Sequence, residues 1–243
     1  MEGEQTRSIL LDIEGTTTPI TFVHEVMFSY ARTHVRAFLS EHLASRNTVT
    51  DIAAIKKEHA ADVEQGHNPP PLVSGDVDSL TTYIHWLIDR DRKSSPLKSL
   101  QGKIWQKGFL DGTLTAQVYD DVPAALQRWH QAGLTINIFS SGSKLAQRFL
   151  FAHTEAGDLT EFIDNYFDTT IGPKKESESY RRIASKLGLA EGAILFISDT
   201  VAELEAARNA GMQTRLSIRS GNQPQEGSAG HQALNSFDEL GPL

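Results

Sequence analysis

Cysteine is absent from the 243-residue sequence, which excludes disulfides, thiolate metal sites and cysteine nucleophiles. The first seven residues are polar and charged and lack the apolar stretch of a signal peptide. No apolar run approaches the roughly 18 residues that a membrane-spanning helix needs. We therefore expect a soluble cytoplasmic protein that has no membrane partner.

Basic residues are also scarce. The chain has 23 Lys and Arg against 31 Asp and Glu, a formal net charge of -8. A nucleic-acid surface needs clustered Lys and Arg, so nucleic acid is not an expected partner. A small anionic substrate remains compatible with this composition, because it responds to local rather than net charge.

Short apolar runs at 8–12, 134–140 and 193–199 are typical of buried parallel strands, and 213–218 is a further candidate. Helical patterns cover 121–132, 176–187 and 201–210, and a glycine stands close to the end of each. Strands that alternate with helices predict an α/β fold with a doubly wound parallel sheet.

The interval between the first two strands is much longer than one strand–helix–strand crossover requires. It contains helix-like segments near 21–44, 48–65, 76–92 and 97–111, and little strand signal. We expect residues 19–117 to form an inserted α-helical cap domain. Residues 1–18 and 118–243 would then form the catalytic α/β core.

Polar side chains follow the apolar runs. Asp12 and Glu14 end the first run, Ser140 and Ser141 the second, and Asp199 the third. In an α/β sheet, ligands bind outside the carboxyl ends of the strands. Asp12 and Glu14 are two residues apart, so an extended backbone would point them the same way, about 7 Å apart.

A cluster of carboxylates needs compensation. Two like charges about 4 Å apart repel by roughly 4 kcal/mol at an effective dielectric constant of about 20. Glu203, one helical turn after Asp199, adds a further acid. A divalent cation is the simplest compensation, and oxygen ligands without cysteine favour Mg²⁺. The alternative is that each acid separately caps a helix or lies in solvent.

Phosphoryl transfer supplies roles for such residues. An aspartate can attack phosphorus to give an acyl phosphate, and a second acid can serve the leaving oxygen and then water. Donors must bind the equatorial oxygens. Ser140 to Gly142 offer donors, with a helix expected to begin near Ser143. The loop 172–175 offers a lysine, at either of two adjacent positions.

These segments resemble, in order, the four motifs of the haloacid dehalogenase superfamily: 12–17, 140–143, Lys174 and 198–199. More closely, the chain resembles the enolase-phosphatase family of methionine salvage, which typically has glutamate where Glu14 stands. Further matches lie at 100–105, 166–172 and 176–180. The resemblance covers nearly the whole chain, including the inserted cap.

The resemblance implies a haloacid dehalogenase-like core, one Mg²⁺ per subunit and a monomer. The implied substrate is 2,3-diketo-5-methylthiopentyl 1-phosphate. The family enolises it and then dephosphorylates the enol, giving the acireductone 1,2-dihydroxy-3-keto-5-methylthiopentene and phosphate.

Residue by residue, the resemblance makes Asp12 the nucleophile and a metal ligand. It makes Glu14 the acid/base and a ligand through its backbone carbonyl, and Asp199 completes the metal ligands. The substrate phosphate would be held by Ser140, Ser141 and Lys174. Lys174 is preferred over Lys175 because it stands third in the Gly-x-Lys pattern.

Other readings of the same residues are another capped magnesium-dependent phosphatase or phosphomutase, and a catalytically silent binding protein. A receiver-type signalling module also combines an acidic pocket, a phosphorylated Asp, a hydroxyl residue and Lys. Such modules are about half this length and lack a helical insertion after the first strand.

Overall fold

The computed structural model describes residues 5–90, 92, 94–222 and 227–241. The chain divides into two compact units. One consists of residues 1–23 and 115–243, and the other of residues 24–114. The insertion expected from the sequence, 19–117, is a few residues longer at each end. Among the residues described, no helix is both long and apolar enough to cross a membrane.

The larger unit is built on a six-stranded sheet of order β3-β2-β1-β4-β5-β6, in which all neighbouring strands are parallel. The strands are β1 (Ser8–Leu11), β2 (Thr135–Phe139), β3 (Asn165–Phe167), β4 (Ile194–Ser198), β5 (Gln213–Ser217) and β6 (Gln232–Leu234). The predicted doubly wound parallel sheet is confirmed. The short outer strands β3 and β6 were not predicted.

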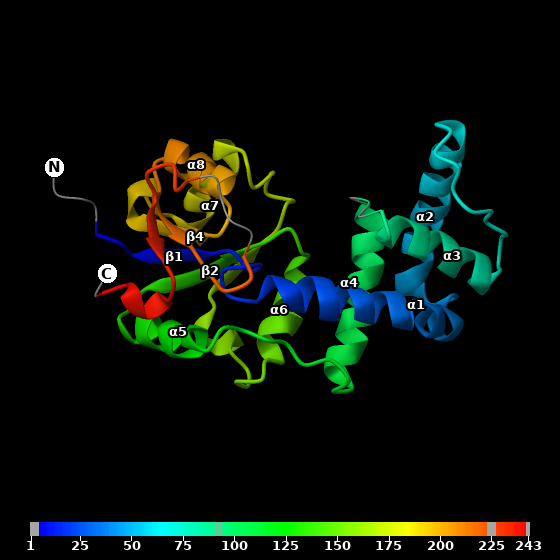
Figure 1. The fold of residues 1–243 in the computed structure, drawn as a ribbon, viewed down its shortest axis with the longest axis horizontal. Coiled ribbons are helices and arrows are strands. Elements are labelled where there is room, and N and C mark those ends of the chain that lie inside the picture. Colours follow the sequence, from blue (N-terminus) through cyan, green and yellow to red (C-terminus); the bar gives the residue numbers. More distant parts are fainter. Residues whose placement is uncertain (1–4, 91, 93, 223–226, 242–243) are drawn as a thin grey trace. The chain divides into compact units, whose positions relative to one another are not determined.

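Helices cover both faces of this sheet: α5 (Asp121–Gln131) and α6 (Lys144–Ala152) lie on one, and α7 (Ser177–Leu187) and α8 (Val201–Ala210) on the other (Figure 1). Short 3-10 turns η2 (Thr160–Phe162), η3 (Glu191–Ala193) and η4 (Phe237–Glu239) complete the unit. β1 and β4 are buried throughout, as their continuous apolar runs predict.

The strand register brings the sequence-predicted strand ends together. Leu11 of β1 is level with Ile138 of β2 and with Ile197 of β4. The residues that follow these strands therefore emerge at one edge of the sheet, beside the central strand.

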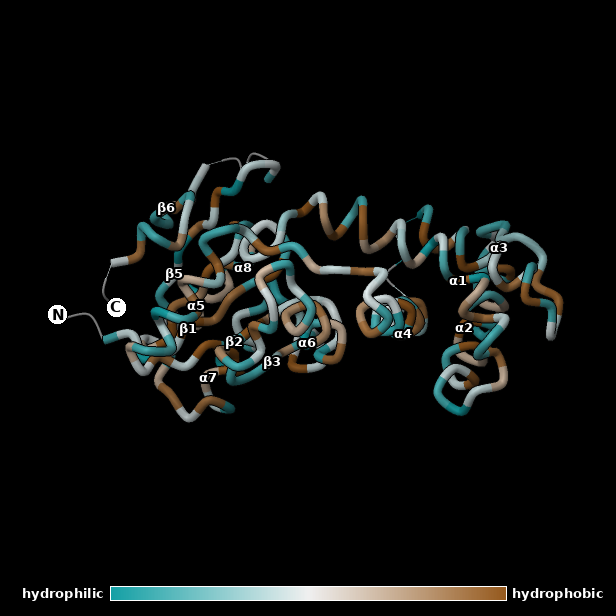
Figure 2. Tube along the Cα trace, turned by 90° about the horizontal axis from the view of Figure 1, so that it is seen from below, coloured by the Kyte–Doolittle hydropathy of each residue, from teal (hydrophilic) through white to brown (hydrophobic). Residues whose placement is uncertain are grey.

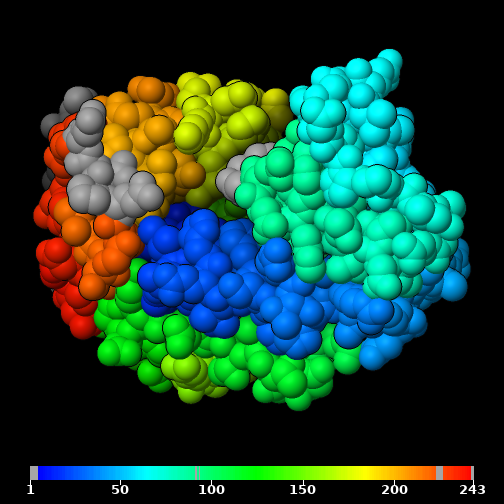
Figure 3. All heavy atoms as spheres, turned by 45° about the vertical axis from the view of Figure 1, so that its right-hand side comes forward, coloured from blue at the N-terminus to red at the C-terminus, as the bar shows by residue number. Residues whose placement is uncertain are grey.

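All regular secondary structure in the described residues of the smaller unit is helical. It begins within the π-helical turn η1 (Phe22–Met27) and continues through α1 (Phe28–His42), α2 (Arg46–Glu64), α3 (Val77–Ile88) and α4 (Ser95–Leu110). These are the helical segments that the sequence predicts. Hydrophobic and hydrophilic residues are interspersed along them (Figure 2). In the space-filling view, the cyan to teal atoms of α2 and α3 form part of the surface of this unit (Figure 3).

A buried carboxylate ties this helical unit together. Asp62 of α2 is 1% exposed and accepts hydrogen bonds from Tyr83 Oη (2.6 Å) and Arg92 Nη2 (2.7 Å), and its Oδ1 lies 2.9 Å from His67 Nδ1. Burial alone would raise the pKa of Asp62, but its bonds to His67, Tyr83 and Arg92 bring that pKa below its usual value.

We expect Asp62→Ala to lower the free energy of unfolding by about 3 kcal/mol, because Tyr83 and Arg92 lose a buried partner. Urea unfolding measures this. Asp78→Ala is the matched control: it removes the exposed Arg36–Asp78 pair and should cost less than about 1 kcal/mol. Equal losses of unfolding free energy in the two variants would contradict the stabilising role given to Asp62.

Comparison of wild type with Asp62→Ala also tests how the stabilisation by Asp62 depends on pH. The pKa of Asp62 is lower in the folded chain than its usual value. Its stabilisation is therefore present above about pH 4 and is lost on acidification, so wild type and variant should converge at low pH.

Candidate active site

The segment that follows β1 is a compact turn, here called the β1 loop (residues 12–18). Asp12, 4% exposed, donates its backbone N–H to Ile197 O of β4 (3.0 Å). Within the loop, Ile13 O accepts the N–H groups of Thr16, Thr17 and Thr18 at 3.2, 3.0 and 2.9 Å. The carboxylate of Asp12 is thus carried by a backbone that is hydrogen-bonded on both sides.

Lys174 places its ammonium between two carboxylates. Its Nζ lies 2.5 Å from Asp12 Oδ1 and 2.6 Å from Glu203 Oε2. The Tyr180 hydroxyl of α7 donates to the backbone carbonyl of Lys174 (2.6 Å) and so holds the loop that carries it. Lys175, the other lysine of that loop, is exposed. Of the two adjacent lysines, Lys174 is therefore the one that pairs with Asp12.

The electrostatics of this pair follow from burial and charge. Burial alone would lower the pKa of Lys174, but Asp12 and Glu203 raise it above its ordinary value. Burial and the charge of Asp12 raise the pKa of Glu203 to about 7, which Lys174 offsets only in part. Lys174 is therefore a fixed positive charge at this sheet edge.

Asp199, which follows β4, faces the β1 loop. Burial first, and then the charges of Asp12 and Glu14, raise the pKa of Asp199 to about 6, while Thr200 Oγ1 donates to its Oδ1 (3.0 Å). Gly15 has φ +67°, and a Cβ there would lie 2.5 Å from Asp199 Oδ2. Only glycine accommodates both this backbone conformation and this close carboxylate.

Glu14 lies in the β1 loop next to Gly15, half-buried, and its backbone pairs with Thr18 as an isolated bridge. Burial is the main cause that raises the pKa of Asp199, and the negative charge of Glu14 raises it further. Asp12, Glu14 and Asp199 are therefore close enough in space to interact electrostatically.

Ser140 and Ser141 follow β2 at the same edge. Ser140 is 7% exposed; its N–H donates to Phe167 O (3.2 Å), and its Oγ accepts from Gly142 N (3.3 Å). Ser141 is exposed. Ser143 caps the following helix, since its Oγ accepts from Ala146 N (3.2 Å). The hydroxyls thus precede a helix N-terminus, as the sequence predicts.

The residues at this edge suit a hard divalent cation. Carboxylate and carbonyl oxygens are the donors that Mg²⁺ prefers, and Lys174 balances only part of the negative charge of Asp12, Asp199 and Glu203. Within the described ranges, no three acidic or histidine side chains form a metal site by themselves. The set expected from the sequence needs only two carboxylates, because its third ligand is a backbone carbonyl.

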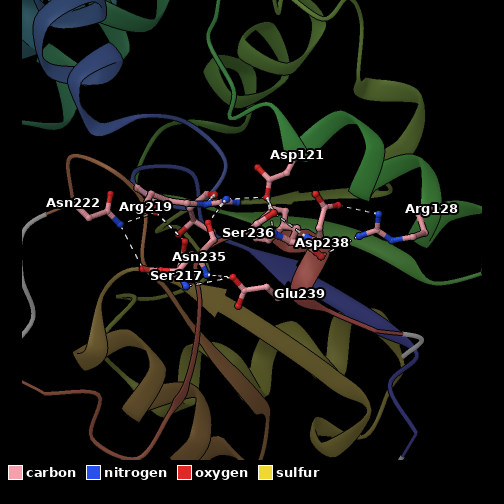
Figure 4. A network of polar contacts seen from close by, with 12 residues as sticks. Asp121, Arg128, Ser217, Arg219, Asn222, Asn235, Ser236, Asp238 and Glu239 are labelled. Atoms are coloured by element: carbon pink, nitrogen blue, oxygen red, sulfur yellow. Dashed lines mark hydrogen bonds and ion pairs between the residues drawn. The ribbon is translucent and has the colours of Figure 1, made fainter.

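Residues from the C-terminal part of the chain also reach the β1 loop, and the sequence analysis did not identify them. Ser217, Arg219 and Asn222 donate hydrogen bonds to its backbone (Figure 4). Ser217 is the last residue of β5, and Arg219 and Asn222 lie in the segment that follows it. The available signal in the sequence was a polar residue, Ser217, near the end of the expected strand 213–218.

Comparison with known proteins identifies the family. A model of haloacid dehalogenase-like hydrolases matches residues 6–211, and the chain belongs to this class. It is 49% identical to "Enolase-phosphatase E1" of Synechococcus elongatus over 96% of this chain and 97% of that protein. It is 42% identical to the protein of the same name in Sorangium cellulosum, over 97% of each. The chain is therefore a member of the enolase-phosphatase E1 family, which confirms the resemblance seen in the sequence.

A plant relative from Sorghum bicolor is described as a probable bifunctional methylthioribulose-1-phosphate dehydratase/enolase-phosphatase E1. It is 42% identical, and the match spans 98% of this chain but 48% of the relative. Among solved structures, the UTR4 protein of Saccharomyces cerevisiae superposes with a TM-score of 0.79 at 31% identity, covering 97% of this chain and all of that one. A receiver module is excluded by these matches.

The Gly15 contact generates a prediction. Gly15→Ala should destabilise the chain more than Gly133→Ala. Both positions have positive φ (+67° and +79°), which costs alanine roughly 1–2 kcal/mol, but a Cβ at 133 meets nothing within 4 Å. The comparison of urea midpoints isolates the clash of the added Cβ with Asp199 Oδ2 and Asn222 Oδ1. Equal destabilisation would show that this contact is not tight.

Proposed function

We propose that the chain converts 2,3-diketo-5-methylthiopentyl 1-phosphate into the acireductone 1,2-dihydroxy-3-keto-5-methylthiopentene and phosphate, through an aspartyl phosphate on Asp12. Membership of the enolase-phosphatase E1 family supports the substrate. The observation that carries the mechanism is the pairing of Lys174 with Asp12 at 2.5 Å. It places a fixed positive charge beside the carboxylate oxygen that would attack phosphorus.

In the phosphatase half-reaction, a carboxylate oxygen of Asp12 forms a bond to phosphorus while the bond from phosphorus to the substrate oxygen breaks. Glu14 gives its proton to that leaving oxygen. Glu14 then takes a proton from water, whose oxygen attacks phosphorus, releases phosphate and restores the Asp12 carboxylate. One acid thus serves both steps.

Lys174 and the serines would hold the phosphoryl group. The ammonium of Lys174 lies at Asp12 and would neutralise charge on the equatorial oxygens as they approach that carboxylate. Ser140, Ser141 and the N–H groups that precede α6 would donate to the same oxygens.

Asp12, Asp199 and the backbone carbonyl of Glu14 would hold one Mg²⁺ per subunit. Bound Mg²⁺ supplies positive charge that favours approach of the phosphate dianion to the acidic edge. The carbonyl's direction is fixed locally: Gly15 N–H donates to Thr18 O (2.8 Å). Because the peptide is planar and trans, the Glu14 C=O points the opposite way.

The enolisation requires a base beside the substrate carbonyl. We propose Glu14 for this step as well, because its side chain is longer than that of aspartate and it lies in the β1 loop beside the nucleophile. We further propose that the protein works as a monomer in the cytoplasm; size-exclusion chromatography with light scattering and cell fractionation test these two points.

Product identification tests the activity. Incubation with the diketo phosphate and Mg²⁺ should yield acireductone and free phosphate, and neither should form after chelation of the metal. Asp12→Asn should abolish phosphate release, because the amide is not a nucleophile. Turnover of other sugar or metabolite phosphates in preference to this substrate would favour a different capped phosphatase. Normal phosphate release by Asp12→Asn would remove Asp12 from the mechanism.

The same assay addresses Glu14. With a non-hydrolysable phosphonate analogue, Glu14→Gln should fail to enolise the substrate, because the amide cannot accept the proton. Enolisation at the wild-type rate would assign the base to another residue.

The two lysines provide a matched pair. Lys174→Ala should lower kcat/KM by about 100-fold or more, the typical effect of losing one charge-stabilising donor. Lys175→Ala removes an exposed lysine from the same loop and should change kcat/KM less than about threefold. Steady-state kinetics at saturating Mg²⁺ measure both values. Similar losses of kcat/KM in the two variants would contradict the role given to Lys174.

A further inference from the structure

The chain turns back onto the β1 loop immediately after β5. Ser217 Oγ and Asn222 Nδ2 both donate to Gly15 O, at 3.1 and 2.9 Å. Arg219 Nε donates to the next carbonyl, Thr16 O, at 3.2 Å. Three side chains from residues 217–222, here called the β5 clamp, therefore bind two consecutive carbonyls of the loop that carries Asp12 and Glu14 (Figure 4).

Arg219 anchors this clamp in the core of the larger unit. It is 7% exposed, and its Nη1 donates to Asp121 Oδ2 (2.8 Å) and to Asn235 O (2.9 Å). Its guanidinium carbon lies 4.6 and 4.5 Å from the ring centroids of Tyr119 and Phe237. A paired, planar cation between two rings is held in one orientation, so the bond to Thr16 O has a rigid base.

The clamp fixes the orientation of Gly15 from one side while the β1 loop fixes it from the other. Gly15 N–H is bound by Thr18 O at 2.8 Å, and Gly15 O is bound by Ser217 and Asn222. Gly15 has φ +67° and no side chain to restrict it. These three bonds therefore set the orientation of the peptide units on both sides of Gly15, including the one that contains the Glu14 carbonyl.

A second observation points toward a cation beside the clamp. Asn222 Oδ1 is buried and has no hydrogen-bond partner among the residues that the structure describes. A Cβ on Gly15 would lie 2.8 Å from this oxygen and 2.5 Å from Asp199 Oδ2, so the two acceptors face one small space. Two facing acceptors require a donor or a cation between them, and hydrated Mg²⁺ is both.

We propose that Ser217, Arg219 and Asn222 are positioning residues for the Mg²⁺ site. They act through the backbone of Gly15 and Thr16, and Asn222 also acts through its Oδ1 toward Asp199. The inference rests on the proposed function, because it assumes that Mg²⁺ binds at Asp12, Glu14 and Asp199. None of the three residues touches the reacting phosphoryl group.

The test is Mg²⁺ affinity, measured by isothermal titration calorimetry on the full chain without substrate. Ser217→Ala and Asn222→Ala each remove one donor to Gly15 O, and the second also removes Oδ1. We expect the Kd for Mg²⁺ to rise about 10-fold in each variant, with a larger effect for Asn222→Ala, as is usual for groups that orient metal ligands.

Arg128→Ala is the matched control. Arg128 is also an arginine bound to the η4 turn, through Phe237 O (3.0 Å) and Asp238 (3.4 Å), but among the described residues its side chain makes no hydrogen bond or ion pair with the β1 loop. It should bind Mg²⁺ as wild type does. Arg219→Lys keeps the positive charge but removes the planar guanidinium with its several donors. This variant should bind Mg²⁺ more weakly, while its circular dichroism spectrum shows an intact fold.

The outcomes separate the two proposals. If wild type binds no Mg²⁺, both the proposed function and the clamp are wrong. If wild type binds Mg²⁺ and the clamp variants bind it equally well, the clamp alone is wrong. Loss of affinity in Arg128→Ala to the same extent as in Asn222→Ala would also overturn it, because the effect would then be a general loosening of the unit. Weakened binding confined to the clamp variants supports the proposal.

Discussion

One buried ammonium makes the acidic sheet edge possible. Asp12, Glu203 and Asp199 converge where strands β1 and β4 end, and such a group of carboxylates repels itself in a region of low dielectric constant. Lys174, within 2.6 Å of two of them, keeps both in place. Neighbouring side chains position the residues of this contact: Tyr180 Oη donates to the backbone carbonyl of Lys174, and Ser198 Oγ donates to Glu203 (3.1 Å).

The acidic sheet edge also depends on the parallel sheet, which brings its residues to one place. β1 lies between β2 and β4, so residues distant in the chain meet on either side of Asp12. The side chains proposed to perform chemistry lie just beyond the strands, where backbone groups no longer pair within the sheet. There the loops can present N–H groups, carbonyls and carboxylates to a ligand.

Much of this was predictable from the sequence, for identifiable reasons. The strands β1, β2 and β4 are nearly continuous apolar runs because helices bury both faces, and each run is followed by polar residues that share an edge. The helical insertion was predicted because its patterns lack β signal. Lys174 was chosen over Lys175 from the resemblance, and the structure places Lys174, not Lys175, at Asp12.

Other features could not be predicted, because they depend on tertiary contacts. β3 and β6 have three residues each and are half exposed, so they carry no periodic signal of their own and pair only because a neighbouring strand is present. Arg219 looks like an ordinary surface residue in sequence. Its burial depends on Asp121, Tyr119 and Phe237, which come from distant segments.

The position of the helical unit in the chain has a consequence for synthesis. β1 leaves the ribosome before its neighbours β2 and β4, which begin only at Thr135 and Ile194. During that interval the exposed hydrophobic edge of β1 has no strand to pair with, while residues 24–114 can already fold as a compact helical unit. The insertion therefore sets a delay during translation, in which β1, the strand that precedes Asp12, waits unpaired for its two neighbours.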